Sequence, residues 1–462
     1  VVGQKNELDI YLAEEGTNLN DVVVIGYGTQ RREAVTGSVA NVKGDMLREV
    51  PGSDVSQALQ GRIAGVEMAQ TSSKPGASMQ IRIRGTRSLT ASNDPLIVLD
   101  GIPFAGSLND IDPNNIKTMD ILKDASATAI YGSRGANGVI IITTKNGQRN
   151  SKTTVNYSGY LTLSGFCNKL DMMDGSDIRD GKTDFKDKGY DTDWLDAVTR
   201  TAFIHNHNLA IRGGNNTTTY SADFTYRNQQ GVFINTYGDE MHFTGDLAHW
   251  FFDDKVKIAF NLVKHWHKNG PVDAAGTQVY RQAIMRNPTE PIYNSDGSYY
   301  ENMAINYYMN PIALLKEHTG EYKTEDTRLT GNITVEPIRG WKTNLMLSTD
   351  RSNAHDEGYY TSKYYDQVIN GHTGYAYHSY AYGKTDNLEV TSTYKHQWGE
   401  HRFEALAGYS YQYDEYEGFN ANNTDFMSDF FEYNNIGIGE FLKEGKAGMG
   451  SYKNDDHLVG FF

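Results

Sequence analysis

Two neighbouring stretches decide the fold: PLIVLDGIP at Pro95–Pro103 and LKDASATAIYGSRGANGVIIITTK at Leu122–Lys145. Short runs of β-branched residues alternate here with glycine-rich turns and a short helical segment. This pattern, which extends from Gly37 to Gly147, is typical of a small α/β domain with a mixed sheet. After Gln148 the chain consists of amphipathic strands whose connections are alternately short and very long. The sequence therefore divides into two kinds of structure.

Composition limits the possible classes of protein. Only 38% of the 462 residues are apolar, and no apolar run approaches the roughly 18 residues of a membrane helix. Strands of a membrane β-barrel stay possible because they present lipid with every second side chain. The net charge of -15 argues against a nucleic-acid partner, which requires clustered Lys and Arg. The single Cys167 excludes an internal disulfide and a cysteine-based zinc site.

The second part of the chain predicts ten strands. In residues 220–227, the side chains of Tyr220, Ala222, Phe224 and Tyr226 share one face, while polar side chains share the other. The predicted strands cover residues 153–163, 203–212, 217–228, 239–252, 256–267, 325–337, 341–352, 384–398, 402–413 and 457–462. Glycines in the first domain form neither of the two standard phosphate-binding motifs, so turn and packing roles are expected for them.

The connections between these strands favour a membrane barrel over a soluble sandwich. Residues 213–216, 253–255, 338–340 and 399–400 are turns of a few residues. The links at about 164–202, 268–324, 353–383 and 414–456 are far longer. Short turns on one rim and long loops on the other are typical of outer-membrane barrels.

The N-terminal residues predict two further segments. Residues 1–18 resemble the end of a domain that began earlier. In Asp21–Ile25, an acidic residue precedes four β-branched ones, so this segment is suited to add as a strand to the sheet of another protein. From the residues alone, an ordinary edge strand is the simpler interpretation.

The chain resembles the SusC/RagA family of TonB-dependent outer-membrane transporters. The resemblance runs from Leu19 to the C-terminus. It rests on five motifs, which are DVVVIGYGTQ (Asp21–Gln30), ALQGRIAGV (Ala58–Val66), IRIRGTRSL (Ile81–Leu89), PLIVLDGIP, and LKDASATAIYGSRGANGVIIITTKNG from Leu122. It implies a partial membrane β-barrel with an N-terminal α/β plug domain in its lumen, with ten of an expected 22 strands.

The resemblance also implies a division of the chain into four parts. Residues 1–18 are the tail of an accessory domain, 19–30 the TonB-box segment, 31–150 the plug, and 151–462 the N-terminal part of the barrel. Within the second part, Asp21, Val22, Val23, Val24 and Ile25 are expected to bind TonB, which is driven by its inner-membrane energising complex.

The function implied is active import of a nutrient across the outer membrane of a Gram-negative bacterium. An oligosaccharide is the expected cargo and a peptide the alternative. A SusD-like surface lipoprotein is the expected lid, in a dimer of SusC–SusD complexes. The rival from another class is a surface binding or adhesion barrel whose plug never moves. A passive porin is disfavoured by the plug motifs.

Two arginines are candidates for holding the plug in the barrel. Arg82 and Arg84 alternate with Ile81 and Ile83, so both guanidiniums lie on one face of a predicted strand. The functional interpretation is a lock onto carboxylates of the barrel wall. The alternative is ordinary surface charge. Asp100 and Asp124 are weaker candidates of the same kind.

The expected ligand contacts lie in the plug and in the long loops. Arg87, Ser88 and Asn93 belong to the upward plug loop. Tyrosines dominate the loop at 353–383, and the candidates there are Tyr359, Tyr360, Tyr364 and Tyr365. A tyrosine ring with a polar tip suits a sugar or a peptide, and it equally suits a protein interface.

Neither an enzyme nor a cofactor is predicted. His205/His207 and His265/His267 are i,i+2 pairs on strands, which is compatible with metal ligation. Neither pair has a carboxylate at a defined spacing, so interfacial aromatics are the preferred interpretation and no metal site is expected. Nothing pairs a nucleophile with a base at a recognisable motif.

Overall fold

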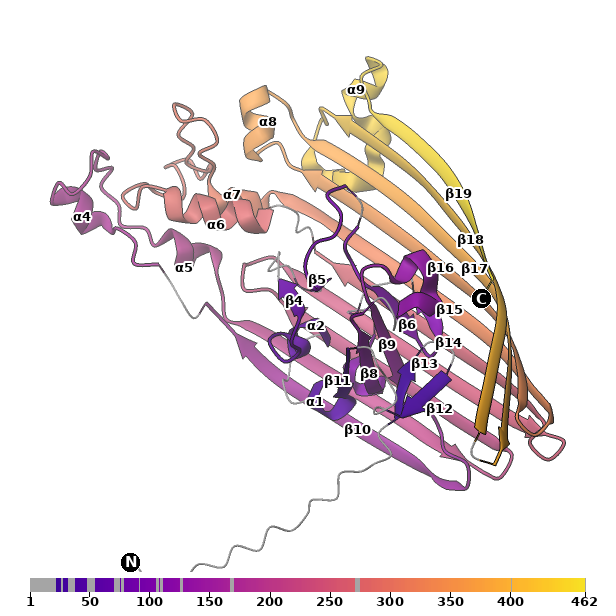
Figure 1. Cartoon of the computed structure of the whole chain (residues 1–462). Helices are drawn as coiled ribbons and strands as arrows, with labels where there is room; N and C mark the ends of the chain where they lie inside the picture. Colours follow the sequence, from indigo (N-terminus) through magenta and orange to yellow (C-terminus); the bar gives the residue numbers. More distant parts are fainter. Residues whose placement is uncertain are drawn as a thin grey trace, which may run out of the picture.

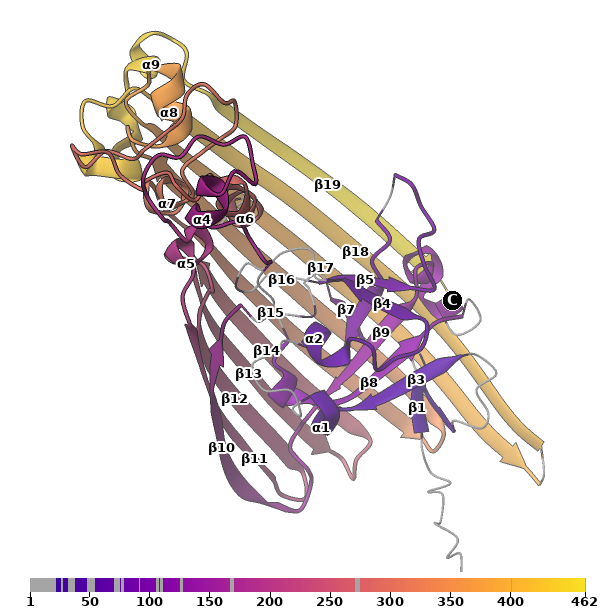
Figure 2. The same ribbon diagram turned by 90° about the vertical axis from the view of Figure 1, so that its left-hand side faces the viewer.

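In the computed structural model, a small α/β domain lies against the concave face of a large curved sheet (Figures 1 and 2). We call the domain the plug and the sheet the wall. The structure describes residues 22–25, 28–31, 38–47, 55–69, 75, 79–90, 92–104, 108, 111–124, 128–166, 170–270, 275–399 and 401–461. The predicted tail at residues 1–18 and Asp21 lie outside the described residues.

The plug is built on a five-stranded mixed sheet. Its order is β3 (Val39–Lys43), β8 (Ile116–Leu122), β9 (Val139–Thr144), β6 (Leu96–Leu99) and β7 (Ile102–Phe104). Only β6 and β9 run parallel, and the other neighbours are antiparallel. The remaining elements are α1 (Gly44–Leu47), α2 (Val55–Leu59), β4 (Val66–Ala69), β5 (Gln80–Ile83) and η3 (Pro113–Asn115).

The apolar run in β9 is buried on both sides. Ile140 and Ile142 face the main core with α1, α2, β4 and β5, whereas Val139 and Ile141 face a smaller cluster with Tyr131. A strand covered on both faces needs a continuous apolar run rather than alternation. Tyr131 belongs to η4 (Ala129–Gly135), a 3-10 turn with a left-handed Gly132. Of the helix predicted at 125–131, the described residues 128–131 are helical: the N–H of Thr128 donates to the carbonyl of Asp124 at 3.1 Å, and Ala129–Tyr131 belong to η4. Gly132, with a positive φ of 58°, introduces a kink directly after them.

The wall contains ten antiparallel strands in chain order, which confirms the predicted partial barrel. The strands are β10 (Ser151–Ser164), β11 (Ala202–Gly214), β12 (Thr218–Gln230), β13 (Tyr237–Phe251), β14 (Val256–Asn269), β15 (His318–Ile338), β16 (Trp341–Tyr360), β17 (Tyr375–Trp398), β18 (His401–Thr424) and β19 (Met449–Phe461).

The two faces of the wall differ as the alternation predicted. On β12, Ser221, Asp223 and Thr225 are buried toward the plug, while Tyr220 and Phe224 are exposed on the opposite face. An outward apolar face opposite a polar inward face is the requirement for a sheet that separates lipid from an aqueous lumen.

Short turns connect the strands at one rim and long connections at the other (Figure 1). The predicted loop at 353–383 is wrong in extent, because β16 and β17 pair without interruption from Trp341↔Tyr394 to Tyr360↔Tyr375. Several tyrosines assigned to this loop therefore lie in strands. The long connections carry α4 (Gly175–Arg179), α5 (Trp194–Val198), α6 (Ala275–Met285), α7 (Pro311–Lys316), α8 (Tyr365–Asn370), η5 (Asp429–Ile438) and α9 (Glu440–Lys443).

Three of these connections, at 165–201, 270–317 and 361–374, pack together around one apolar core, which we call the loop layer. Trp194, Val198, Val279, Ile312 and Tyr365 are among its buried side chains. No helix among the described residues is both long enough and apolar enough to cross a membrane.

Candidate functional site

The described contacts between plug and wall come from turns at the ends of the plug strands, from β7 and from η4. Asp112 is one of them. Its carboxylate caps η3 by accepting from the backbone N–H of Asn114 at 2.9 Å. The same carboxylate accepts from the hydroxyl of Thr225 on β12 and from Nδ2 of Asn208 on β11 at 3.4 Å. Both wall partners are neutral, so this contact is a set of hydrogen bonds and not an ion pair.

Arg212 on β11 makes the second contact. It forms an ion pair of 2.5 Å with Asp223 on β12. Its Nε donates to the carbonyl of Lys145 in the plug at 3.2 Å, and its Nη2 donates to Oδ1 of Asn115 at 3.4 Å. The charge of the arginine is therefore compensated within the wall, and the plug supplies only neutral acceptors.

Arg328 on β15 repeats this arrangement. It pairs with both oxygens of Asp350 on β16, at 2.6 and 3.2 Å, and donates to the carbonyl of Pro103 in the plug at 2.9 Å. Its guanidinium also lies 4.7 Å from the ring centroid of Phe104. A fourth contact joins Arg134 of η4 to Gln412 on β18 at 2.6 Å. At these four positions in the described part of the chain, plug and wall are joined by hydrogen bonds that water could replace.

A cavity of about 260 Å³ with a mixed polar and apolar lining lies beside the Arg328 contact. Its lining includes Asp100 and Asn146 of the plug, and Asp246, Lys257 and Asn332 of the wall. Asp100 accepts from the backbone N–H and the hydroxyl of Thr144 at 2.9 and 2.7 Å, and burial raises the pKa of this carboxyl to about 6. The polar groups on its lining, including Asp100, Asp246 and Asn332, could hold bound water at one side of the cavity.

The predicted lock residues lie elsewhere. Arg84 forms an ion pair with Asp124, and Arg82 donates to Thr86, so both contacts stay within the plug. Arg84 follows β5 with a positive φ of 58°, and this turn directs its side chain back onto the plug. In this structure Arg84 thus pairs within the plug, and a lock of Arg82 and Arg84 onto the wall stays a prediction. Sequence reasoning missed Arg212 and Arg328, although a charged residue within an inward polar face was the available signal.

The predicted ligand residues of the plug do come together. Oδ1 of Asn93 accepts from the backbone N–H groups of Arg87 and Ser88, at 2.7 and 2.8 Å, and its Nδ2 donates to the carbonyl of Ser88 at 2.8 Å. Asn93 is thereby engaged in closing the loop. Leu89 at the tip of this loop is fully exposed. The Asn93 amide is therefore used within the loop, and the tip of the loop is exposed; binding of a ligand by Arg87, Ser88 and Asn93 stays a prediction.

The predicted tyrosines separate into two pairs. Tyr359 is buried and donates to Asp429 at 2.7 Å, and Tyr365 is buried in the loop layer. Both therefore hold loops together in this structure, and their contact with a ligand stays a prediction. Tyr360 and Tyr364 are half-buried, with ring centroids 4.5 Å apart. Because β16 alternates, Tyr360 shares the inward face of Asp350, while Tyr359 lies on the outward face.

Tyr360 and Tyr364 belong to an aromatic cluster on the inward face near the long-loop rim. Tyr360 stacks on His318 at 4.1 Å, and Tyr375 and Tyr377 lie within 6.2 Å of it. Tyr375 pairs directly with Tyr360 in the sheet. Half-buried aromatic faces with polar tips are suited to stack on a planar or ring-shaped ligand.

The histidine pairs occupy opposite faces of the wall. His207 accepts or donates a hydrogen bond with Tyr157 at 2.7 Å on the outward side. His265 stacks on His242 at 4.2 Å, and His267 lies 3.4 Å from Glu240, on the inward side. Neither pair is among the groups of His, Cys, Asp and Glu side chains close enough to share a metal ion in the described part of the chain.

The N-terminal segment forms a strand, as predicted for Val22–Ile25. This strand, β1 (Val22–Ile25), pairs antiparallel with β2 (Gly28–Arg31), and among the described residues the sheet has only these two strands. Next in the described sequence comes β3, which lies at the edge of the plug sheet and pairs with β8. A pulling force on β1 would therefore reach the plug sheet first at its edge strand, β3.

Comparison with known proteins gives consistent relationships. Residues 31–139 match the family model described as TonB-dependent Receptor Plug Domain. TonB-dependent receptor P26 of Formosa agariphila is 35% identical over 433 residues, which cover 89% of this chain and 43% of the relative. TonB-dependent receptor SusC of Bacteroides thetaiotaomicron is 33% identical over 367 residues, covering 76% of this chain and 35% of the relative. The chain thus spans less than half the length of these relatives.

Solved structures share the fold. The RagAB peptide importer in its open-open state superimposes with a TM-score of 0.80 at 24% identity, covering 95% of this chain and 54% of that chain. The ferripyoverdine receptor of Pseudomonas aeruginosa shares the fold more distantly, with a TM-score of 0.58 at 11% identity over 95% of this chain and 51% of that chain. The plug, the wall and their relative arrangement are therefore those of known receptors.

Proposed function

This chain is part of a SusC-like TonB-dependent receptor of the Gram-negative outer membrane, and from that premise we propose that it imports a nutrient by TonB-driven movement of its plug. The observation that carries the proposal is the chemistry of the plug–wall contact. Arg212 and Arg328 of the wall remain paired with the wall carboxylates Asp223 and Asp350 when the plug leaves. Withdrawal of the plug then leaves neither arginine as an unpaired buried charge, and an unpaired buried charge would be a large energetic barrier to its movement.

Asp21–Ile25 is the proposed TonB-binding segment. Strand addition transmits force through main-chain hydrogen bonds, so it requires an extended backbone with free N–H groups more than particular side chains. The strand geometry of β1 supports this role. The edge position of β3 supports stepwise unravelling of the plug sheet under load. The four-part division of the chain remains part of the same proposal.

The proposed cargo is an oligosaccharide. The inward aromatic cluster of Tyr360, Tyr364, Tyr375 and Tyr377 offers half-buried rings for stacking on sugar rings at the long-loop rim. A peptide is the second candidate, because the structural relative RagAB is described as a peptide importer. A SusD-like lipoprotein is the proposed lid over this rim, in a dimer of two such complexes.

Deletion of Val22–Ile25 tests the energy coupling. We expect uptake to be lost and binding of the nutrient by purified receptor to be unchanged. A finer test replaces Val24 with proline, which removes a main-chain donor, and compares it with Val24→Thr, which keeps the β-branched backbone preference. Normal uptake by the proline variant would contradict strand addition. Purification from native outer membrane, with identification of the co-purifying lipoprotein and retained ligand, tests partner and cargo.

A further inference from the structure

The outward face of the wall changes from apolar to charged along its strands. On β16, Leu345 and Leu347 are followed on the same face by Arg351, His355 and Glu357. About 9–11 residues of a tilted strand cross a bilayer, whereas β16 contains 20 residues. The end of β16 nearest the long loops therefore lies beyond the lipid, in contact with aqueous solution.

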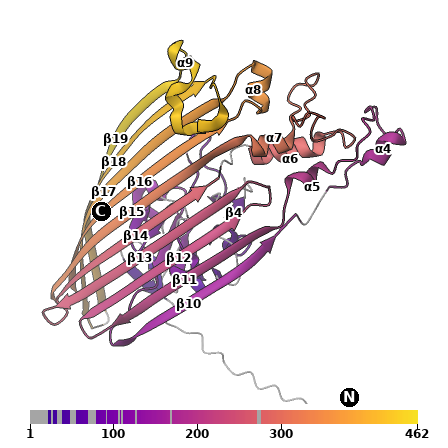
Figure 3. The same ribbon diagram turned by 180° about the vertical axis from the view of Figure 1, so that it is seen from behind.

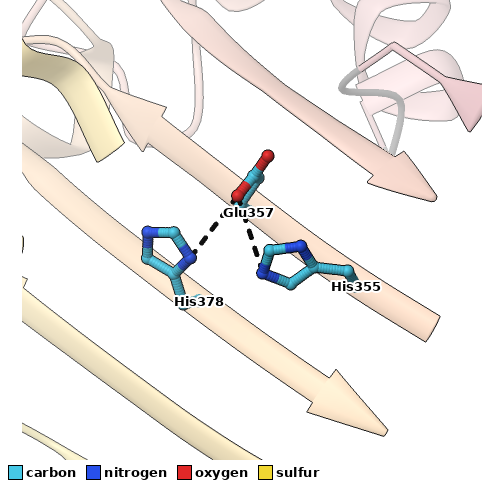
Figure 4. Close-up of side chains that lie close together, drawn as sticks. All are labelled: His355, Glu357 and His378. Atoms are coloured by element: carbon cyan, nitrogen blue, oxygen red, sulfur yellow. Dashed lines mark ion pairs between the residues drawn. The ribbon is translucent and has the colours of Figure 1, made fainter. Parts of the chain in front are cut away.

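Three metal-ligand side chains converge in this part of the outward face. His355 and Glu357 are two residues apart on β16, and His378 is the direct partner of Glu357 on β17. Figure 4 shows the Glu357 carboxylate between the two imidazole rings. One ligand atom from each residue lies within 4.8 Å of the other two. The arrangement follows from strand register, which places i, i+2 and cross-strand neighbours on one face.

The distances suit a shared ion better than direct hydrogen bonds. Oε2 of Glu357 lies 3.6 Å from Nε2 of His355 and 3.5 Å from Nδ1 of His378. Hydrogen bonds between such groups are normally about 2.7–3.2 Å long. Ligands bound to Zn²⁺ at about 2.0–2.1 Å in a tetrahedron are roughly 3.3 Å apart. Small side-chain shifts would therefore bring all three atoms to coordination distance.

A second interaction prepares His378 as a ligand. Nε2 of His378 lies 2.7 Å from the carbonyl oxygen of Tyr433, and it must donate because a carbonyl can only accept. Its Nδ1 is then the unprotonated nitrogen in the neutral ring, and this is the atom that faces Glu357. Metal-binding histidines commonly donate their other N–H to a backbone carbonyl in this way.

The two carboxylate oxygens of Glu357 face different partners. Oε1 lies 3.4 Å from Nζ of Lys323, while Oε2 faces both histidines. Lys323 also pairs with Glu321 at 2.5 Å, so it keeps a carboxylate partner if Glu357 binds a cation. The side chain of Glu357 is 12% exposed, that of His378 is 29% and that of His355 is 43%, so an ion can enter from solution.

We propose that His355, Glu357 and His378 form a Zn²⁺ site that fastens the β18–β19 connection to the outer face of the wall. This connection, residues 425–448, packs on β16 and β17 through η5 and places α9 outside the wall (Figure 3). Tyr433, whose carbonyl holds His378, belongs to η5. Zinc would fix the His378 ring and, through it, the position of η5. The fourth coordination position is left for water.

Calorimetric titration of chelator-treated, purified receptor with Zn²⁺ tests the site. We expect one site per receptor, and at least about tenfold weaker binding in each of His355→Ala and Glu357→Gln. Glu417→Gln is the matched control, because Glu417 is a carboxylate on the adjacent β18 that pairs with Lys453 at 3.2 Å and should bind Zn²⁺ like wild type. Absence of micromolar binding, or wild-type affinity in both ligand variants, would overturn the proposal.

Proteolysis tests the fastening role separately from transport. Lys443 and Lys446 in the β18–β19 connection are exposed and accessible to a lysine-specific protease. Zn²⁺ should slow cleavage there several-fold in wild type and in Glu417→Gln, and have no effect in Glu357→Gln, which keeps the His378–Tyr433 hydrogen bond. Binding of Zn²⁺ without any protection of these two sites would refute the fastening role.

Discussion

The plug and the loop layer rest on the same wall but are held by different chemistry. In the loop layer, Arg286 is fully buried and lies 3.4 Å from both Glu290 and Glu301, within a continuous apolar core. At the described contacts, the plug meets the wall through hydrogen bonds in which one partner is neutral, beside a cavity of mixed lining. Separating a buried ion pair leaves an unpaired buried charge, whereas a hydrogen bond with only one charged partner can be replaced by water more readily. We therefore expect the loop layer to keep its shape and the plug–wall contact to open more easily.

The largest effect should come from the loop layer. Arg286→Ala would leave Glu290 and Glu301 buried without their cation, and it would also remove the hydrogen bond to the carbonyl of Tyr300 at 2.8 Å. We expect a loss of about 3–5 kcal/mol in local stability, measured as hydrogen exchange in α6 and α7. Arg281→Ala, an exposed arginine on the same helix, is the control. If hydrogen exchange in α6 and α7 were equal in Arg286→Ala and Arg281→Ala, the buried ion pairs would not distinguish the loop layer from the plug contact.

A second variant tests whether the wall compensates its own charges. Arg328→Ala leaves Asp350 largely buried and unpaired, so we expect the free energy of unfolding of the receptor to fall by about 3 kcal/mol. Arg351→Ala on the outward face removes a pair with Asp386 that is about one-third exposed, and it should cost less than about 1 kcal/mol. Urea titration of both variants measures the difference. If Arg328→Ala loosened only the plug, the arginine would belong to the plug contact instead.

The loop layer should also weaken as pH rises. Burial raises the pKa of Glu301 from 4.5 to about 7, against the opposing effect of Arg286. A carboxyl group whose pKa is higher in the folded than in the unfolded state stabilises the fold fully when the pH is below the unfolded pKa. This contribution is lost as pH rises from about 4.5 through 7. The hydrogen-exchange protection of α7, corrected for the pH dependence of the intrinsic exchange rate, should drop by about tenfold or more between pH 5 and pH 8. In Glu301→Gln the protection of α7 should depend less on pH. If the protection still dropped between pH 5 and pH 8, another group would be responsible.

Much of the difference between the plug contact and the loop layer cannot be predicted from the sequence, for a physical reason. Alternation along one strand predicted the plug-facing side of β12 and the existence of the wall, because periodicity is a local property. The contacts that decide function arise from register between strands. Tyr359 and Tyr360 are neighbours of the same type, yet one is buried against Phe426 and the other faces the aromatic cluster. Likewise, Glu357 and His378 are joined only by pairing of β16 with β17.

The smallest expected effect is at the plug contact. Asp112→Ala removes the η3 cap and the acceptor for Thr225 and Asn208, and we expect a cost of about 1 kcal/mol because both wall partners are neutral. Hydrogen exchange should rise in β8, which directly follows η3, and remain unchanged in α6 and α7. Asp94→Ala, an exposed carboxylate that accepts locally from Ser92 at 2.8 Å, is the control. A cost as large as that of Arg286→Ala would mean that the plug is locked by buried charge after all, and that TonB must break an ion pair and not only hydrogen bonds.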